Sequence, residues 1–290
     1  MTAGRFAPSP SGDLHVGNLR TALLAWLFAR STGRDFLMRV EDLDRVRPGA
    51  EDRQLEDLRA IGLDWDGEVV RQSERRALYD EAIDRLTGAG RVYPCFCTRR
   101  EILDAPSAPH TPPGSYPGTC RDLTEAERSR RSAERPAALR LRSDADGWTI
   151  TDLLHGEFAG VVDDLVLRRN DGVPAYNLAV VVDDGDQGVD QVVRGDDLLT
   201  SAARQAYLAT LLGHEPPTYA HVPLALSTSG QRLAKRDGAV TRTELEERGF
   251  DVFALMAASL DLDGRSPTDL LDSFDPQRLP RHPWTFVPPT

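Results

Sequence analysis

The stretch that decides the fold lies near the start of the chain and reads RFAPSPSGDLHVGN, from Arg5 to Asn18. Its two prolines exclude regular structure, and its two glycines let the backbone approach a ligand closely. The apolar run 19–30 follows at once and has the length of a buried helix. We therefore predict a turn that leads into a helix N-terminus, where free N–H groups and the helix dipole favour an anion such as phosphate. His15 adds a donor there, although a glycine turn alone would indicate only a histidine-capped turn.

Downstream of this stretch, strand-like and helical patterns alternate. Residues 35–40 predict a short strand, and 50–61 and 73–86 predict helices. Ser73 is a plausible N-cap of the second helix, and Gly88 a plausible stop. The order strand, helix, strand, helix indicates an α/β fold with a parallel sheet.

The second half of the chain returns to the same alternation after a polar segment. The Asp171-Gly172 pair is typical of a hairpin turn. A helix over 201–212 should stop at Gly213. Further strands are expected at 165–169, 179–182, 189–193 and 219–226. Residues 125–134 predict a helix with a solvated, charged face.

Composition limits the classes of protein that fit. The chain has 290 residues, of which 40% are hydrophobic, and can bury a sizeable core. No apolar run spans a bilayer and no signal-peptide pattern begins the chain, so we expect a cytoplasmic protein that does not bind membranes. The net charge of −11 argues against an indiscriminate nucleic-acid binder. Lys235 is the only lysine among 35 basic residues, which suggests that a compact ammonium is needed there.

The three cysteines suggest a metal site in a reducing compartment. Cys95 and Cys97 form a Cys-x-Cys pair, and Cys120 closes a segment rich in Pro, Gly, Ser and Thr that needs a staple. Structural zinc takes four ligands, and His110 and Tyr116 are both available as the fourth. Generic ligand preference favours His110. The alternative is three thiols that bind no metal.

Two stretches together resemble one family. The stretch around His15 is similar to the ATP-binding signature of class I aminoacyl-tRNA synthetases, in the form of the glutamyl-type enzymes. The second stretch, QRLAKRDG at 231–238, resembles the mobile phosphate-binding loop of the same class. It keeps Lys235 but has Arg232 and Ala234 where the family often has lysine and serine. The missing hydroxyl at Ala234 puts loop closure or ATP affinity in doubt.

The resemblance implies a division of the chain. Residues 1–94 and 164–240 would form the two halves of a Rossmann-like class I catalytic domain. Residues 95–163 would be an inserted subdomain that holds zinc, and 241–290 a short helical C-terminal appendage.

The resemblance also implies roles for individual residues. His15 and Lys235 would be catalytic, and Glu41 would receive the α-ammonium of glutamate. The resemblance implies that Tyr116 would be the fourth zinc ligand, because the family uses a Cys-x-Cys…Tyr-x-x-x-Cys arrangement. The implied ATP-binding residues are Pro8, Gly12, His15, Gly17, Asn18 and Lys235. The implied glutamate-binding residues are Arg5, Ser9, Glu41, Tyr176 and Arg194. Arginine suits a carboxylate because it can bind it with two parallel hydrogen bonds.

The activity implied is formation of glutamyl-adenylate from glutamate and ATP, with Mg, followed by transfer to RNA. The chain ends at Thr290, before an anticodon-binding portion, and this is typical of the glutamyl-queuosine tRNA(Asp) synthetase family, which glutamylates queuosine in the anticodon of tRNA(Asp). One zinc per chain and a monomer are expected. The alternatives are a glutamyl-tRNA synthetase core that charges tRNA(Glu) at its 3′ end, and a synthetase-like binding module without activity.

Overall fold

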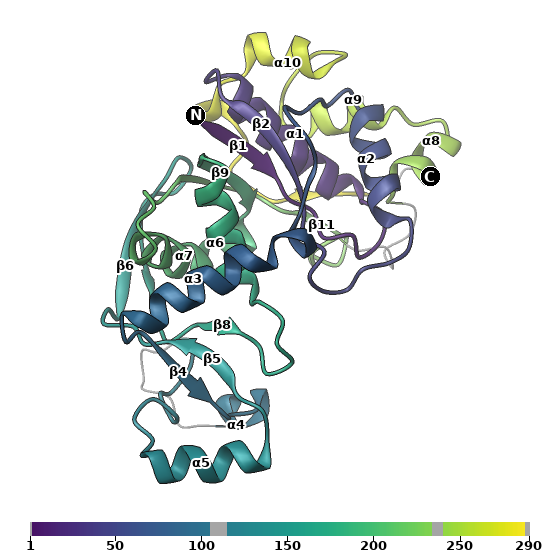
Figure 1. Cartoon of the computed structure of the whole chain (residues 1–290). Helices are drawn as coiled ribbons and strands as arrows, with labels where there is room; N and C mark the ends of the chain where they lie inside the picture. Colours follow the sequence, from purple (N-terminus) through teal and green to yellow (C-terminus); the bar gives the residue numbers. More distant parts are fainter. Residues whose placement is uncertain (1, 105–114, 234–239, 288–290) are drawn as a thin grey trace.

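The computed structural model describes residues 2–104, 115–233 and 240–287. Its largest element is a sheet with the strand order β3-β2-β1-β9-β10-β6-β7 (Figure 1). All neighbours pair in parallel except β6 and β7, which form an antiparallel hairpin at one edge. The strands are β1 (Ala3–Phe6), β2 (Asp35–Val40), β3 (Val70–Arg71), β6 (Gly147–Asp152), β7 (Gly156–Val161), β9 (Val189–Gly195) and β10 (Thr218–Val222). The predicted Rossmann-like α/β fold is confirmed, although the first strand, β1, had no sequence prediction.

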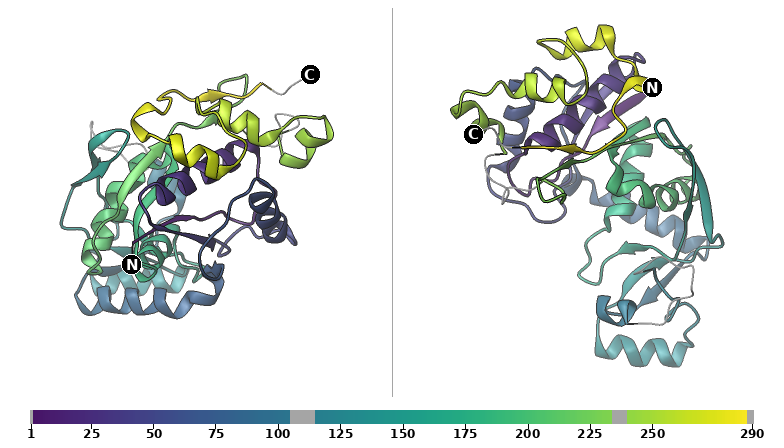
Figure 2. Two further views of the ribbon diagram at one scale, coloured as in Figure 1. Left: turned by 90° about the horizontal axis from the view of Figure 1, so that it is seen from above. Right: turned by 180° about the vertical axis from the view of Figure 1, so that it is seen from behind.

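Helix α1 (Val16–Arg30) lies at the centre of the main core. It is buried on nearly every side, as expected for a helix that is apolar all round. One side packs on β1, β2 and β9, and the other meets the C-terminal helices α9 (Val252–Ala258) and α10 (Pro267–Ser273). Figure 2 shows these yellow-green helices lying over α1 from above and behind. The expected helical appendage therefore seals the core around α1.

The C-terminal region contains further short elements. Helix α8 (Arg242–Glu247) and the 3-10 turn η4 (Pro276–Arg278) lie on either side of α9 and α10 in the sequence. Strand β12 (Trp284–Thr285) pairs in parallel with β11 (Ala225–Leu226). None of the helices in the described ranges is both long and apolar enough to cross a membrane.

Two predicted boundaries need correction. The strand expected at 219–226 is interrupted, because Pro223 cannot donate to the ladder and separates β10 from β11. Ser73 is not an N-cap: it lies in the 3-10 turn η1 (Gln72–Arg75), and its N–H and hydroxyl donate to Asp42 at 2.7 and 2.5 Å. The helices predicted at 50–61 and 73–86 are α2 (Ala50–Ala60) and α3 (Arg76–Gly88), and α3 ends at Gly88 as expected.

The strand predicted at 179–182 is wrong, because these residues belong to helix α6 (Tyr176–Asp186). The Asp171-Gly172 turn is present, with Gly172 at φ +84°, but it connects a strand to α6 and not two strands. Helix α6 packs against α3, α7 (Leu199–Leu211) and β8 (Val166–Arg168), so its valines are buried on several sides. An apolar run of four residues cannot distinguish a buried helix from a strand by periodicity.

A second, smaller sheet forms one end of the molecule (Figures 1 and 2). It has the order β4-β5-β8, with β4 (Val92–Cys95) and β5 (Ala138–Leu141) antiparallel. Helices α4 (Arg99–Leu103) and α5 (Glu125–Glu134) lie beside it, each begun by a threonine capping box. Of this sheet, β5 lies within the expected insertion 95–163, whereas β4 ends at the first residue of the insertion and β8 follows it. The β6–β7 hairpin of the insertion belongs to the large sheet.

Candidate active site

A cavity of about 520 Å³ opens beyond the carboxyl ends of β1, β2 and β9. Strands β1 and β9 are neighbours in the sheet although far apart in the sequence, and ligands of open α/β sheets bind at such a switch point. All the described residues with a predicted ATP or glutamate role line this cavity. They are Arg5, Pro8, Ser9, Gly12, His15, Gly17, Asn18, Glu41, Tyr176 and Arg194.

The N-terminus of α1 faces the cavity and is capped by His15. Nδ1 of His15 accepts the N–H of Asn18 at 3.2 Å, and the Asn18 side chain accepts the N–H of His15 at 3.2 Å. Because Nδ1 is an acceptor, a neutral His15 carries its proton on Nε2. A Cβ at Gly17 would lie 2.7 Å from Ala225 Cβ, so only glycine fits here. His15 can therefore cap α1 through Nδ1 and still face a ligand in the cavity.

Glu41 places a carboxyl in the cavity immediately after β2. Its side chain is 11% exposed, and Arg39 Nη2 lies 3.8 Å from one of its oxygens. Burial raises the pKa of Glu41 to about 7, against the opposing effect of Arg39 and Arg5. Without a cationic ligand, the Glu41 carboxyl is thus near the midpoint of its titration at neutral pH.

Two arginines bring positive charge to the cavity, with different partners. Arg5 donates to Asp184 at 3.2 Å, and Asp184 also pairs with the fully buried Arg39 at 2.8 Å. Arg194 instead donates to His221 at 3.0 Å and to Gln205 at 2.7 Å.

Sequence reasoning did not identify the supporting residues Asp184, His221 and Gln205. The signal available for Asp184 was an acid pair within the apolar run that forms α6. Burial lowers the pKa of His221, against the opposing effect of Asp152.

The second predicted loop is described only in part. Arg232 lines the cavity rim and pairs with Asp197, in the turn η2 (Asp196–Leu198), at 2.6 Å. Leu226 and Arg232 form an isolated bridge, which brings the loop back toward β11. Ala234 and Lys235 lie outside the described residues.

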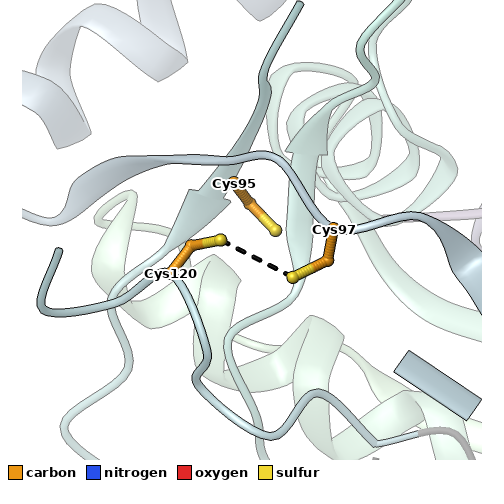
Figure 3. Close-up of side chains that lie close together, drawn as sticks. All are labelled: Cys95, Cys97 and Cys120. Carbon is orange, nitrogen blue, oxygen red and sulfur yellow. Dashed lines mark hydrogen bonds between the residues drawn. The ribbon is translucent and has the colours of Figure 1, made fainter. Parts of the chain in front are cut away.

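The three cysteines gather at the smaller sheet (Figure 3). Their sulfur atoms all lie within 4.8 Å of one another, and those of Cys97 and Cys120 are 3.5 Å apart. The Tyr116 hydroxyl lies 3.3 Å from the sulfur of Cys95 and 3.9 Å from that of Cys97. Tetrahedral zinc with Zn–S of about 2.3 Å requires ligand separations of about 3.8 Å, which these groups approach. His110, the other candidate ligand, lies outside the described residues.

Two arginines offset the negative charge that such a ligand set would carry. Arg131 donates to the Cys120 sulfur at 3.4 Å, and the Arg140 guanidinium lies 3.7 Å from the centre of the Tyr116 ring. Nearby cations favour thiolate and phenolate, the forms that bind a metal. The residues present therefore fit a zinc ion.

Comparisons with known proteins identify the family of the chain. Residues 2–282 match the family model described as tRNA synthetases class I (E and Q), catalytic domain. A protein of Nocardia farcinica named Glutamyl-Q tRNA(Asp) synthetase is 68% identical over 289 residues, which cover 98% of this chain and 93% of the relative. A protein of the same name from Cutibacterium acnes is 56% identical, over 90% of this chain and 76% of the relative.

A solved structure has a similar fold at lower sequence identity. The crystal structure of a glutamate tRNA ligase from Elizabethkingia meningosepticum, in complex with its amino acid, superposes with a TM-score of 0.82 and 28% identity. The match covers 99% of this chain and 67% of the solved chain.

Proposed function

This chain belongs to the class I tRNA synthetases of the glutamate and glutamine (E and Q) family, and from that membership we propose that it activates L-glutamate with ATP and transfers it to the queuosine base of tRNA(Asp). The names of the relatives support this acceptor over the 3′ end of tRNA(Glu). The observation that carries the activation step is the joining of Glu41, two arginines and the α1 N-terminus in one cavity.

The cavity supports a specific placement of glutamate. Its α-ammonium pairs with the Glu41 carboxylate, and its side-chain carboxylate meets Arg194, with Arg5, Ser9 and Tyr176 around it. This leaves the α-carboxylate directed to the nucleotide.

The nucleotide would occupy the α1 end of the cavity. Its phosphates would lie against the N-terminus of the helix and His15, in the space left by Gly12 and Gly17, with Pro8 and Asn18 beside them. Lys235 completes this set. An α-carboxylate oxygen attacks the α-phosphorus of Mg·ATP, and the bond to the departing pyrophosphate breaks. No enzyme nucleophile is needed, because positioning and charge stabilisation by His15, the backbone and Lys235 lower the barrier.

We also propose one structural zinc, held by Cys95, Cys97, Cys120 and Tyr116. When bound, the ion crosslinks the end of β4 to the segment before α5. Its role is to hold an RNA-facing subdomain, residues 95–163, in which the cluster replaces a large hydrophobic core. The remaining proposed divisions are the catalytic halves 1–94 and 164–240 and the appendage 241–290.

The acceptor is tested by incubating the protein with ATP, labelled glutamate and separate RNAs. We expect label on an anticodon stem-loop of tRNA(Asp) that carries queuosine, as an alkali-labile ester. The same loop with guanosine should stay unlabelled, because guanine lacks the cyclopentene diol of queuosine, whose hydroxyls accept glutamate. Label at the 3′ end of tRNA(Glu) would instead support the alternative, a glutamyl-tRNA synthetase core.

Glutamate binding should weaken as the pH falls below 7. The pKa of Glu41 is about 7, so at lower pH the carboxyl is increasingly protonated and offers no charge to the substrate ammonium. The KM for glutamate in pyrophosphate exchange should rise between about pH 8 and about pH 6, approaching tenfold per pH unit at the acid end. Glu41→Gln should bind weakly with a flat profile over this range. A flat profile in the wild-type protein would contradict the assignment.

A further inference from the structure

The surroundings of Arg194 carry an inference about specificity that rests on the proposed function. Arg194 stands at the carboxyl end of β9, is 6% exposed and lines the cavity. Its Nε donates to Nε2 of His221, and its Nη1 to the side-chain oxygen of Gln205. A longer bond of 3.4 Å joins Nη2 to the Leu198 carbonyl. Of the five N–H bonds of a guanidinium, two remain for a ligand once these three acceptors of the described chain are counted.

Both side-chain acceptors are neutral. Nε2 of His221 can accept from Arg194 only when it carries no proton, so the imidazole proton must sit on Nδ1. There it donates to Asp152 at 2.6 Å. Asp152 is fixed in turn by the N–H groups of Leu154, His155 and His221, at 2.8, 3.0 and 3.0 Å. This carboxylate sets the tautomer without touching Arg194.

Gln205 is held in the same way. Its oxygen faces Arg194, and its amide nitrogen donates to Asn177 at 3.0 Å. A flipped amide would oppose donor to donor at Arg194 and acceptor to acceptor at Asn177, and Arg194 can only donate, so the orientation is determined.

Arg5 gives the contrast within the same cavity. Its Nε is paired with the buried carboxylate of Asp184, which offsets its charge. Within the described part of the chain, Arg194 forms no ion pair with a carboxylate. A cation in a largely desolvated site that lacks a counter-ion attracts an anionic ligand strongly.

We propose that His221 and Gln205 are positioning residues that hold Arg194 through neutral acceptors, so that its charge stays available to the side-chain carboxylate of the substrate. They thereby set the preference for an acidic amino acid over its amide. The hydrogen bonds from Arg194 to His221 and Gln205 fix the position of the guanidinium. Because both acceptors are neutral, they do not offset its positive charge.

Gln205→Glu tests the neutrality directly. The new carboxylate lies 2.7 Å from Arg194 in the wild-type geometry and takes the place of the substrate's charge. We expect the KM for glutamate to rise about 30-fold with kcat nearly unchanged, while use of glutamine changes little. The preference for glutamate over glutamine should therefore fall at least tenfold.

Two variants serve as matched controls. Gln205→Met removes the acceptor without adding charge, and should cost only about threefold in KM for glutamate, with the preference kept. Gln277→Glu makes the same charge change at an exposed position and should match the wild type. A wild-type preference in Gln205→Glu, or an equal loss of preference in Gln205→Met, would overturn the proposal.

Asp152→Asn tests the tautomer of His221 independently. It therefore remains informative even if Gln205→Glu folds poorly. The N–H groups of Leu154 and His155 share one oxygen of Asp152, whereas the other oxygen accepts from Nδ1 and a single backbone N–H, both of His221. The new amide NH₂ opposes fewer fixed N–H groups in the second position, where it faces Nδ1 of His221. This favours the tautomer with a proton on Nε2, which then opposes Arg194. The KM for glutamate should rise about tenfold, whereas Asp272→Asn, the same change at an exposed position, should not alter it. An unchanged KM in Asp152→Asn would contradict the proposed tautomer control.

Calorimetric binding of glutamate and glutamine separates this inference from the proposed function. If the wild-type protein binds glutamate but supports no pyrophosphate exchange, the proposed function fails, and the binding preference of each variant still decides the inference. If the wild-type protein binds glutamine as tightly as glutamate, the inference is wrong even where exchange is found.

Discussion

Arg194→Ala should raise the KM for glutamate in pyrophosphate exchange by about 100-fold or more, with a much smaller change in the KM for ATP. A charge-assisted pair of hydrogen bonds to a buried carboxylate is worth several kcal/mol, and about 1.4 kcal/mol corresponds to a factor of ten. Alanine removes both bonds and leaves His221 and Gln205 without their donor. Initial rates over a range of glutamate concentrations, at saturating ATP, measure the effect.

Arg194→Lys is the matched control for charge. It keeps a cation at the end of β9, but its compact ammonium lacks the planar fork that directs separate N–H groups to His221, Gln205 and a carboxylate. We expect a loss intermediate between wild type and alanine. Thermal melting should show that both variants fold. Equal exchange with aspartate or glutamine in the wild-type protein would show that the pocket is assigned to the wrong ligand.

The cavity at the end of β1, β2 and β9 could be predicted because its main sequence signal is local. The turn from Arg5 to Asn18 and helix α1 follow each other in the chain, and prolines, glycines and an apolar run specify both. The acid at the end of β2 followed from the rule that ligands bind beyond the carboxyl ends of strands. Glu41 and Arg194 indeed line the same cavity.

The parts that sequence reasoning missed depend on partners far apart in the chain. Arg194 and His221 are 27 residues apart, and His221 and Asp152 are 69 apart. No local pattern pairs such residues, because their contact depends on which strands are neighbours in the sheet. The register places His221 on β10 directly beside Arg194 on β9.

The error at α6 has a different cause. Three successive valines favour a strand by intrinsic propensity, which tertiary packing overrides. Here the helix fills the space between α3 and α7, and the apolar run 179–182 is buried against both. The acids that follow, Asp183 and Asp184, form ion pairs from this helix with Arg75, Arg5 and Arg39. These ion pairs cannot be predicted from the local sequence, because the partners are far apart in the chain.

Cys120→Ser should abolish zinc binding and unfold the smaller end of the molecule. The thiol is fully buried beside the sulfur of Cys97, and the ligand set has no further described cysteine to replace it. Metal analysis of protein purified without chelator should give about one zinc per wild-type chain and almost none in the variant. Because metal binding is coupled to folding, the variant should also lose a thermal transition of the subdomain.

Two further variants identify the fourth ligand and locate the effect. Tyr116→Phe keeps the ring that packs under Arg140 and removes only the hydroxyl, so it should weaken zinc retention if the tyrosine is a ligand, whereas His110→Ala should not. The opposite result would assign the position to His110. Pyrophosphate exchange should largely survive in all three variants, because the cavity is built on the large sheet and the cysteines on the smaller one. Transfer of glutamate to RNA should fall with the zinc content. If the wild-type protein contained no zinc, the three thiols would form no metal site. If Tyr116→Phe lost pyrophosphate exchange, the cavity on the large sheet would depend on the smaller sheet.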